Sequence, residues 1–514
     1  MRCAARSACS LYLMDSNIPQ CSDAPLLARK QVEGRPAEAE VAEWVDKQAC
    51  MSPTHPLLRD EHLKLSPLRA IGSWLEPPST AVLWRLRTLL AELDRNGTIR
   101  VITYGGSMQA GEGCSSPSKK KWRCAYSQRF AEWLQVYYPG ARILPDNRAI
   151  GGATSASGLP QLSGWAADTA TTAVLLDFSV NDYYDNSDSV NMCATEVWLR
   201  RFVEEPGVVP ILMDTFPGFA HHPPGSAQPI RDGKLRLARH YGVPVLRYAS
   251  LVPAWYTVDR NHTAEQFAAR KTALLPYSPW WFILNRHLLD YNTSGSDFGH
   301  FRHVPWPTHQ LIADVLSVAW LVWASSARRL LPPLRPPKSS SLDIPPSISD
   351  VQNATLQACK TLPVVCKTPL SFYGDRGPGM QVFDVNATVS NDGNWSFYED
   401  RPGKPGFIAT VHGARLSFPL RFGKTPFFSV TYLRGYDISG VARMTLEGRA
   451  GVSHNQFLSA RRADNLKVTQ GFVFTGVDTG HPKMPWRILA GSTRTLQIQL
   501  IAGNKFKLIS VYSC

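Results

Sequence analysis

The stretch Thr98-Ile99-Arg100-Val101-Ile102-Thr103-Tyr104-Gly105-Gly106-Ser107 decides the fold expected for this chain. Its first half is rich in β-branched residues and predicts a strand. A turn of small residues follows at once and places the Ser107 hydroxyl at the carboxyl end of that strand. Open α/β sheets keep their active sites along this edge. A Gly-Gly-Ser tripeptide is also an ordinary turn, so the role of Ser107 depends on what the other strand ends carry.

The segments around this stretch alternate between strands and amphipathic helices. Helical periodicity is found at residues 80–93, 126–137 and 229–241. Strands are expected at residues 99–103, 142–145, 172–178, 208–213 and 243–246. The run at 172–178 is continuously apolar, which is typical of a strand buried on both faces of a parallel sheet. The alternation predicts a three-layer α/β domain with a doubly wound parallel sheet over residues 79–330.

The pattern changes after a Pro/Ser-rich linker at residues 331–352. Beyond it, apolar residues alternate with a period of two in short segments at 383–387, 427–433, 496–500 and 507–512. Such strands, separated by turns with Gly and Asn, predict an antiparallel β-sandwich or jelly roll over residues 353–514. Residues 1–78 show no steady periodicity, and we expect them to be irregular or partly disordered.

Composition and charge exclude several classes of protein. The 514 residues are 44% hydrophobic and 19% charged, which is typical of a globular protein. The net charge of +14 is scattered, and no helix carries a basic stripe, so nucleic-acid binding is not expected. The excess fits a solvated basic loop or attraction to an anionic polysaccharide or membrane surface. A membrane span is not expected either, because the best apolar stretch, 311–324, is too short and contains Asp314.

Cysteines and glycosylation motifs bear on the compartment. The ten cysteines form no zinc-binding pattern, and we expect neither a metal nor a cofactor. Spacing permits local disulfides between Cys114 and Cys124 and between Cys359 and Cys366, although buried thiols fit equally well. Asn-x-Ser/Thr motifs begin at Asn96, Asn261, Asn292, Asn353, Asn386 and Asn394. They favour a secreted glycoprotein. Residues 1–14 argue the other way, since they lack the apolar core of a leader.

Three segments that follow the Ser107 turn along the chain must be considered together with it. They are Asn147-Arg-Ala-Ile-Gly-Gly-Ala-Thr-Ser155, Ser179-Val-Asn-Asp182 and His303-Val-Pro-Trp-Pro-Thr-His309. In this order the four segments resemble the blocks of the SGNH (GDSL-like) hydrolases, named for Ser, Gly, Asn and His. The resemblance covers roughly residues 80–330, with Gly-Gly-Ser where the family usually has Gly-Asp-Ser. Residues 395–406 are similar to an algal and protist branch in which a β-domain follows the hydrolase.

The resemblance implies a role for each block. Ser107 is the expected nucleophile and His303 the base that takes its proton during attack. The backbone N–H groups of Ser107 and Gly152 and the side-chain amide of Asn181 are the expected donors to the oxyanion. Glycine suits position 152 because the backbone must approach the substrate without a Cβ.

The histidine block departs from the family pattern, in which an acid stands three residues before the base. With His303 as the base, the acid position holds His300, which cannot act as an anion. With His300 as the base, Asp297 keeps the acid spacing but the downstream alignment is lost. We favour His303 because its downstream match is longer. Asp297 then reaches the imidazole around a loop, or a backbone carbonyl orients a Ser–His pair.

The function expected from these residues is that of a serine esterase acting through an acyl-enzyme. An O-acyl ester on a glycan is the favoured substrate, because sandwich modules often bind carbohydrate. A lipid ester or acyl transfer at the same site is an alternative. A second alternative is a catalytically silent carbohydrate-binding or interaction protein that keeps the fold, motivated by His300 in the acid position.

We predict a disulfide between Cys114 and Cys124, in the loop that leaves the Ser107 turn. The nine residues between them allow ring closure without strain. Peptide mapping under non-reducing conditions is expected to yield one cross-linked peptide pair. Recovery of both cysteines as free thiols in the folded protein would contradict this pairing.

Overall fold

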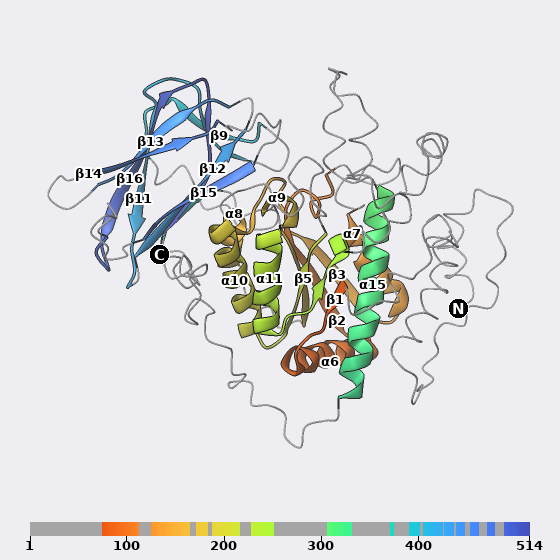
Figure 1. Cartoon of the computed structure of the whole chain (residues 1–514). Helices are drawn as coiled ribbons and strands as arrows, with labels where there is room; N and C mark the ends of the chain where they lie inside the picture. Colours follow the sequence, from red (N-terminus) through yellow and green to blue (C-terminus); the bar gives the residue numbers. More distant parts are fainter. Residues whose placement is uncertain are drawn as a thin grey trace, which may run out of the picture.

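The computed structural model describes the chain in fourteen ranges. They are residues 74–112, 125–164, 171–182, 188–215, 228–250, 306–330, 371–374, 390–400, 405–424, 426–435, 438–447, 453–461, 470–477 and 488–513. The described residues form an α/β layer structure followed by a β-sandwich (Figure 1).

The α/β part is built on a six-stranded sheet with the order β1-β6-β5-β4-β2-β3. Its strands are β1 (Leu75–Glu76), β2 (Thr98–Gly105), β3 (Arg142–Asn147), β4 (Thr172–Asp177), β5 (Val208–Met213) and β6 (Val245–Leu246). Strands β2 to β6 are parallel, and β1 pairs with β6 in the antiparallel direction. Every residue of β4, β5 and β6 is buried, as expected for strands covered on both faces.

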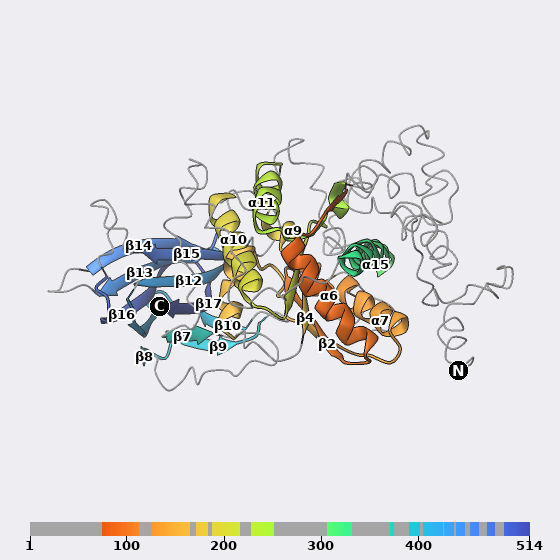
Figure 2. The same cartoon turned by 90° about the horizontal axis from the view of Figure 1, so that it is seen from below.

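Helices cover both faces of this sheet. One face carries α6 (Thr80–Asp94), α7 (Tyr126–Tyr137) and α15 (Trp306–Arg329), and the other carries α10 (Asp188–Glu204) and α11 (Gln228–Tyr241) (Figures 1 and 2). Short helices follow the ends of β3 and β4: α8 (Ser155–Gly158), η2 (Leu159–Gly164) and α9 (Ser179–Asp182). The expected three-layer, doubly wound α/β domain is therefore confirmed.

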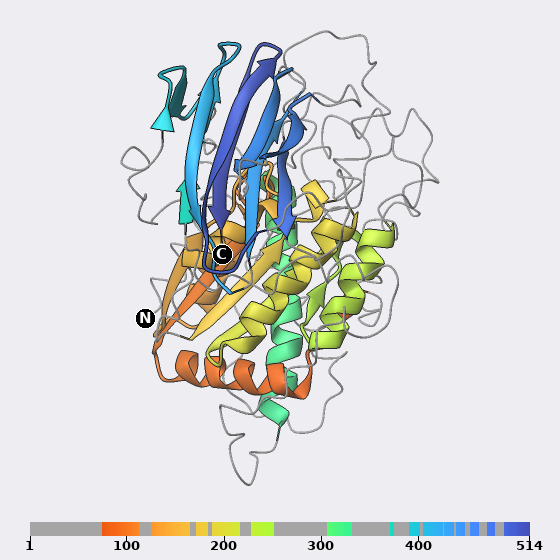
Figure 3. The same ribbon diagram turned by 90° about the vertical axis from the view of Figure 1, so that its left-hand side faces the viewer.

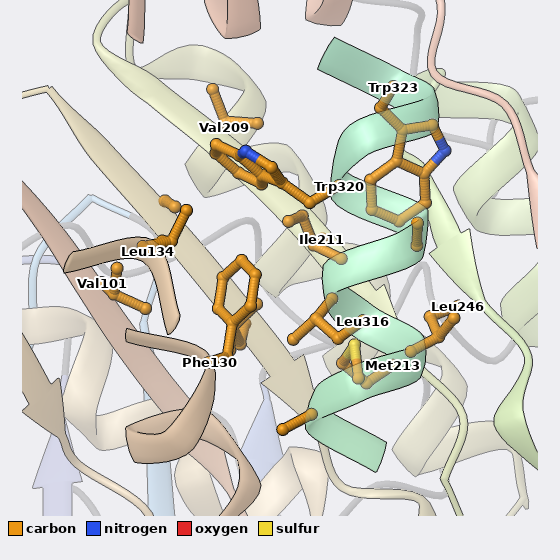
Figure 4. Packing of buried hydrophobic residues seen from close by; sticks show 14 of the residues in the cluster. Val101, Phe130, Leu134, Val209, Ile211, Met213, Leu246, Leu316, Trp320 and Trp323 are labelled. Atoms are coloured by element: carbon orange, nitrogen blue, oxygen red, sulfur yellow. The ribbon is translucent and has the colours of Figure 1, made fainter. Parts of the chain in front are cut away.

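The long helix α15 supplies much of the core on its face of the sheet. Leu316 and Trp320 are fully buried and point toward α7 and the strands (Figure 4). The Trp320 ring meets Phe130 of α7 edge to face, with 5.7 Å between the ring centroids. Basic side chains in the last turn, Arg328 and Arg329, suit the negative end of the helix dipole.

The strand order creates a switch point at the carboxyl edge of the sheet. From β2 the chain passes to β3 on one side, whereas β4, β5 and β6 extend the sheet on the other side. The crossovers that leave β2 and β4 therefore depart toward opposite faces. Ligands of open α/β sheets bind at such points, outside the carboxyl ends of the strands. Ser107 follows β2 and Asn181 follows β4, so both stand at this point.

The C-terminal part is a sandwich of two antiparallel sheets (Figure 3). One sheet holds β7 (Ser371–Gly374), β9 (Trp395–Tyr398), β10 (Gly406–Ala409), β12 (Phe427–Arg434), β15 (Gln470–Val477) and β17 (Phe506–Ser513). The other holds β8 (Ser390–Asn391), β11 (Arg415–Arg421), β13 (Val441–Glu447), β14 (Ser453–Ser459) and β16 (Thr493–Ala502). Alternate residues of β11, β13 and β16 enter the core between the sheets, so the expected two-residue period of burial is found at 496–500. Residues 428–433 of β12 and nearly all of β17 are buried instead, so burial there does not follow the expected alternation.

The sheet begins earlier than the sequence pattern indicates. Residues up to 78 are expected to be irregular, yet Leu75 pairs with Leu246, and the Arg247 N–H donates to the Trp74 carbonyl at 2.7 Å. Trp74 is fully buried in the core under α6 and α15. A two-residue edge strand is too short to show any periodicity, which explains the difference. The linker at 331–352 and the strand expected at 383–387 lie outside the described residues.

Within the described ranges, no helix is both long enough and apolar enough to cross a membrane. Although α15 has 24 residues, it carries Asp314 and ends in arginines.

We predict that Leu316→Ala lowers the free energy of unfolding by about 2–5 kcal/mol, because the truncation leaves a cavity between α15 and the sheet. The control is Val136→Ala on α7, whose side chain is 54% exposed; we expect a change within about 0.5 kcal/mol there. Chemical denaturation followed by tryptophan fluorescence measures both. Equal effects of the two substitutions would contradict the packing of α15.

Candidate functional site

The two glycines that precede Ser107 bond to both neighbouring strand ends. Ser107 is 3% exposed. The Gly106 N–H donates to the Asp177 carbonyl at 3.2 Å, at the end of β4. The Gly105 carbonyl accepts from the Ile150 N–H at 3.0 Å, in the loop after β3. The backbone around Ser107 thus continues the pairing of the parallel sheet and is held from both sides.

Asn181 lies directly over this turn. Its Nδ2 donates to the Ala153 carbonyl at 2.8 Å. A Cβ added to Gly106 would lie 2.2 Å from Asn181 Nδ2 and 3.1 Å from the Ala153 carbonyl oxygen. A side chain at position 106 would therefore force the Asn181 amide to move. The close approach favours a glycine at position 106 of this chain.

Gly152 forms the turn after β3. Its φ of 81° lies in the left-handed region that favours glycine. The Ala153 N–H closes the turn on the Ile150 carbonyl at 3.0 Å. Thr154 then caps α8, because its hydroxyl accepts from the Ser157 N–H at 3.1 Å. The structure thus brings Ser107, Gly152 and Asn181 to the ends of three adjacent strands.

A buried ion pair holds the Asn181 segment in place. Asp182 follows Asn181 in α9, is fully buried, and forms an ion pair with Lys234 of α11. The other carboxylate oxygen accepts the Ser155 N–H at 2.8 Å at the start of α8. Burial raises the pKa of Asp182, and Lys234 opposes that rise. One carboxylate therefore fixes α9 relative to the Gly152 loop.

A second buried carboxylate, Asp177, lies beneath the Ser107 turn. Its Oδ1 accepts the Ser179 N–H at 3.0 Å and the Ser179 hydroxyl at 2.6 Å. Its Oδ2 accepts the Thr215 hydroxyl at 2.5 Å and the Tyr126 hydroxyl at 3.0 Å. Burial raises the pKa of Asp177 to about 6, and these hydrogen bonds oppose the rise. Burial also keeps the pKa of Tyr126 well above its usual range.

Tyr126 links the start of α15 to this site. Its N–H donates to His309 Nδ1 at 3.2 Å, and the two rings stack with centroids 6.1 Å apart. His309 is fully buried in the first turn of α15. The expected base His303 precedes α15 by three residues, and it lies outside the described residues together with His300 and Asp297. Cys114 and Cys124 also lie outside them.

The sequence pattern did not single out the supporting side chains of this site, among them Asp177, Tyr126 and Lys234. One signal was available, since Asp177 is a carboxylate that ends an otherwise apolar buried strand. Such a residue needs several hydrogen-bond donors. Among the residues that the structure describes, no group of three or more His, Cys, Asp and Glu side chains is placed to hold a metal ion.

Comparison with known proteins identifies the fold. No family model and no curated protein matches the sequence. Among solved structures, the chain is similar to a two-domain esterase active on acetylated mannans. That match has a TM-score of 0.54 and 16% identity, and it covers 86% of this chain and 98% of the other.

Two further crystal structures match. The same esterase co-crystallised with mannopentaose has a TM-score of 0.54 and 16% identity, covering 86% of this chain and 97% of the other. A psychrotrophic esterase from Pseudoalteromonas sp. has a TM-score of 0.28 and 13% identity, covering 44% of this chain and 98% of the other. At 16% identity the match to the two-domain esterase shows a shared fold: this chain has its architecture of an α/β core followed by a β-domain.

We predict that Lys234→Met lowers the free energy of unfolding at pH 8 by about 3–5 kcal/mol, because it leaves the Asp182 carboxylate buried and unpaired. The pKa of Asp182 is already raised and rises further without Lys234. A carboxyl group whose pKa is raised in the folded state destabilises that state once pH exceeds the pKa. The loss of stability caused by Lys234→Met therefore becomes smaller as pH falls toward 5. Urea unfolding at the two pH values measures this.

Two controls accompany this experiment. The double variant Lys234→Met/Asp182→Asn, which removes both charges, is expected to recover most of the loss. Arg95→Met breaks the exposed Glu92–Arg95 pair and is expected to change stability by less than about 1 kcal/mol. A loss at Lys234→Met that is independent of pH would contradict the role of Asp182.

Proposed function

We propose that this protein is a serine hydrolase that cleaves an acyl ester through an acyl-enzyme, with Ser107 as the nucleophile. The observation that carries the proposal is the meeting of Ser107, the Gly152 turn and the Asn181 amide at the switch point of the sheet. A nucleophile and groups able to bind an oxyanion are the two parts that acyl transfer requires at one place.

Three donors are proposed for the oxyanion: the N–H groups of Ser107 and Gly152 and the side-chain amide of Asn181. Supporting this assignment, Asn181 Nδ2 lies over the Gly106 backbone, next to the nucleophile, and is held by the Ala153 carbonyl. Its position is set before substrate binds, as electrostatic stabilisation requires. Loss of one such donor typically removes about 2.7–4 kcal/mol of transition-state stabilisation.

His303 is proposed as the base, with Asp297 or a backbone carbonyl orienting its imidazole. Supporting this choice, α15 begins at Trp306, three residues after His303, and its first turn contacts Tyr126 beside the Ser107 turn. The alternative register uses His300 as the base and Asp297 as its acid.

The proposed reaction has two steps. The imidazole takes the proton of the Ser107 hydroxyl while Oγ attacks the ester carbonyl, and the alcohol leaves with that proton. Water then attacks the acyl-enzyme with the imidazole again as base, and the released acid restores Ser107. An alcohol in place of water would make the same site an acyltransferase.

The proposed substrate is an O-acyl group on a polysaccharide. Two observations support it: the esterase with the same two-domain architecture is active on acetylated mannans, and β15 of the sandwich contacts α8, beside the Gly152 turn. A sandwich at this position can hold a polymer near the nucleophile. The likeness of residues 395–406 to an algal and protist branch of SGNH hydrolases agrees with a β-domain in this role.

We predict that the purified chain releases acetate from acetylated mannan and hydrolyses p-nitrophenyl acetate. Ser107→Ala and His303→Ala should each abolish turnover to a similar extent, because nucleophile and base act as one unit. Asn181→Ala should lower kcat/KM by about 10²–10³-fold through loss of an oxyanion donor. His300→Ala, the matched control, should reduce activity less.

Three other outcomes of these assays would each favour a different alternative to the proposed function. A folded wild-type chain that binds acetylated mannan without turnover would favour the silent binding protein. A dispensable His303 with an indispensable His300 would move the base to the Asp297-x-x-His300 register. Transfer of acetyl from a donor to a glycan at a rate above hydrolysis would favour the acyltransferase.

A further inference from the structure

A continuous chain of hydrogen bonds connects the buried carboxylate Asp177 to the backbone next to Ser107. The Tyr126 hydroxyl donates to Asp177 Oδ2 at 3.0 Å. Gln109 Nε2 donates to the Tyr126 hydroxyl oxygen at 2.9 Å. Gln109 Oε1 then accepts the Gly106 N–H at 3.0 Å, and that N–H also faces the Asp177 carbonyl at 3.2 Å. All these side chains are buried.

The chain has one direction as long as Asp177 is ionised. A carboxylate only accepts hydrogen bonds, so the Tyr126 O–H must point at it. The Tyr126 oxygen can then accept, and it takes the Gln109 amide N–H. That orientation leaves Gln109 Oε1, the single acceptor of its amide, facing the Gly106 N–H. The Gly106 N–H can only donate and requires the same orientation of Gln109, so every donor of the chain meets an acceptor while Asp177 is ionised. A donor on the Asp177 carboxyl opposes the Tyr126 O–H, and one hydrogen bond of the chain is then lost.

We propose that Asp177, Tyr126 and Gln109 are positioning residues that orient the Ser107 turn, and that protonation of Asp177 releases this orientation. The proposal adds a pH-dependent element to the active site and rests on the proposed function for its effect on catalysis. Its structural part, the coupling of Asp177 to Gly106, is independent of any reaction.

Each element packed against Asp177 contributes side chains that influence the protonation of its carboxyl group. Ser179 and Thr215 donate to Asp177 from the ends of β4 and β5, and neither titrates in this range. Tyr126 stays protonated because burial holds its pKa well above the usual range. His309 of α15 touches the Tyr126 backbone and ring, so it is the other titratable group to separate. With the pKa of Asp177 raised to about 6, the change falls in the pH range of assays.

The sequence offers a direct probe of this coupling. Only two Gly–Gly dipeptides occur in the chain, Gly105–Gly106 and Gly151–Gly152. Labelling with [1-¹³C]glycine and [¹⁵N]glycine and selecting ¹³C–¹⁵N pairs leaves just the Gly106 and Gly152 amides in the spectrum. In wild type we expect the Gly106 amide proton to move upfield as pH falls through about 6, because it loses the bond to Gln109.

Asp177→Asn keeps the shape but reverses the direction of the chain. The Ser179 N–H is an obligate donor, so the Asn oxygen must face it and the Asn NH₂ must face Tyr126. Tyr126 then accepts from that NH₂ and its O–H turns to Gln109 Oε1. The Gln109 NH₂ now faces the Gly106 N–H, and because both groups only donate, the hydrogen bond between Gln109 and Gly106 is lost. We expect a Gly106 amide shifted upfield at every pH, with no titration.

Two further variants test the same coupling if Asp177→Asn fails to fold. Tyr126→Phe interrupts the chain, so Gly106 should stop responding to pH. Thr215→Val removes one donor from the Asp177 carboxylate, so the Gly106 midpoint should move to higher pH; a response that came from His309 would stay in place. Tyr241→Phe, which removes a buried hydrogen bond to Glu196 at 2.6 Å, is the matched control and should behave as wild type.

The kinetic arm uses p-nitrophenyl acetate. Tyr126→Phe is expected to lower kcat by about ten-fold or more with KM changed less than about two-fold, since it displaces the nucleophile without removing a binding contact. Failure of wild type to turn over any ester would refute the proposed function and leave the Gly106 titration to be judged alone. A flat Gly106 titration in wild type, or one that Tyr126→Phe leaves intact, would overturn the coupling.

Discussion

The close approach of three parallel strand ends is the constraint on which the site depends. The Gly106 N–H is bonded to the end of β4, and the Gly105 carbonyl is bonded to the loop after β3. A side chain at position 106 would displace the Asn181 amide, which already occupies that space. The Ser107 turn is consequently held by the sheet itself, which is more rigid than a free loop and suits the precise placement that the proposed nucleophile requires.

Two buried carboxylates stabilise this arrangement from below. Asp177 gathers hydroxyl and amide donors under the Ser107 turn, and Asp182 joins α9, α8 and α11 through Lys234 and the Ser155 N–H. Burying charge is unfavourable unless each oxygen is satisfied. Both carboxylates meet that condition, and Asp177 accepts four hydrogen bonds. At the carboxyl edge of the sheet, these buried polar groups therefore hold the loops in place and are not part of the apolar core.

The covering helix α15 connects the core to the site. Its middle packs Leu316 and Trp320 on the sheet, and its first turn places His309 against Tyr126. One side chain therefore meets both the start of α15 and, through Gln109, the Ser107 turn. Packing of a long apolar helix and positioning of the turn are thus linked through Tyr126. The sandwich adds a second core of its own and reaches α8 through β15.

The sequence by itself determined the fold class and the order of its elements. Apolar runs at 172–178 and 208–213 became buried parallel strands, and the two-residue period beyond 353 became a sandwich, because burial patterns are local properties of the chain. It also placed Ser107, Gly152 and Asn181 at strand ends. Tertiary structure decided which groups support them: Asp177, Tyr126 and Lys234 come from separate elements, and no local spacing records such long-range hydrogen bonds. The early strand at Leu75–Glu76 likewise exists only through its pairing with β6.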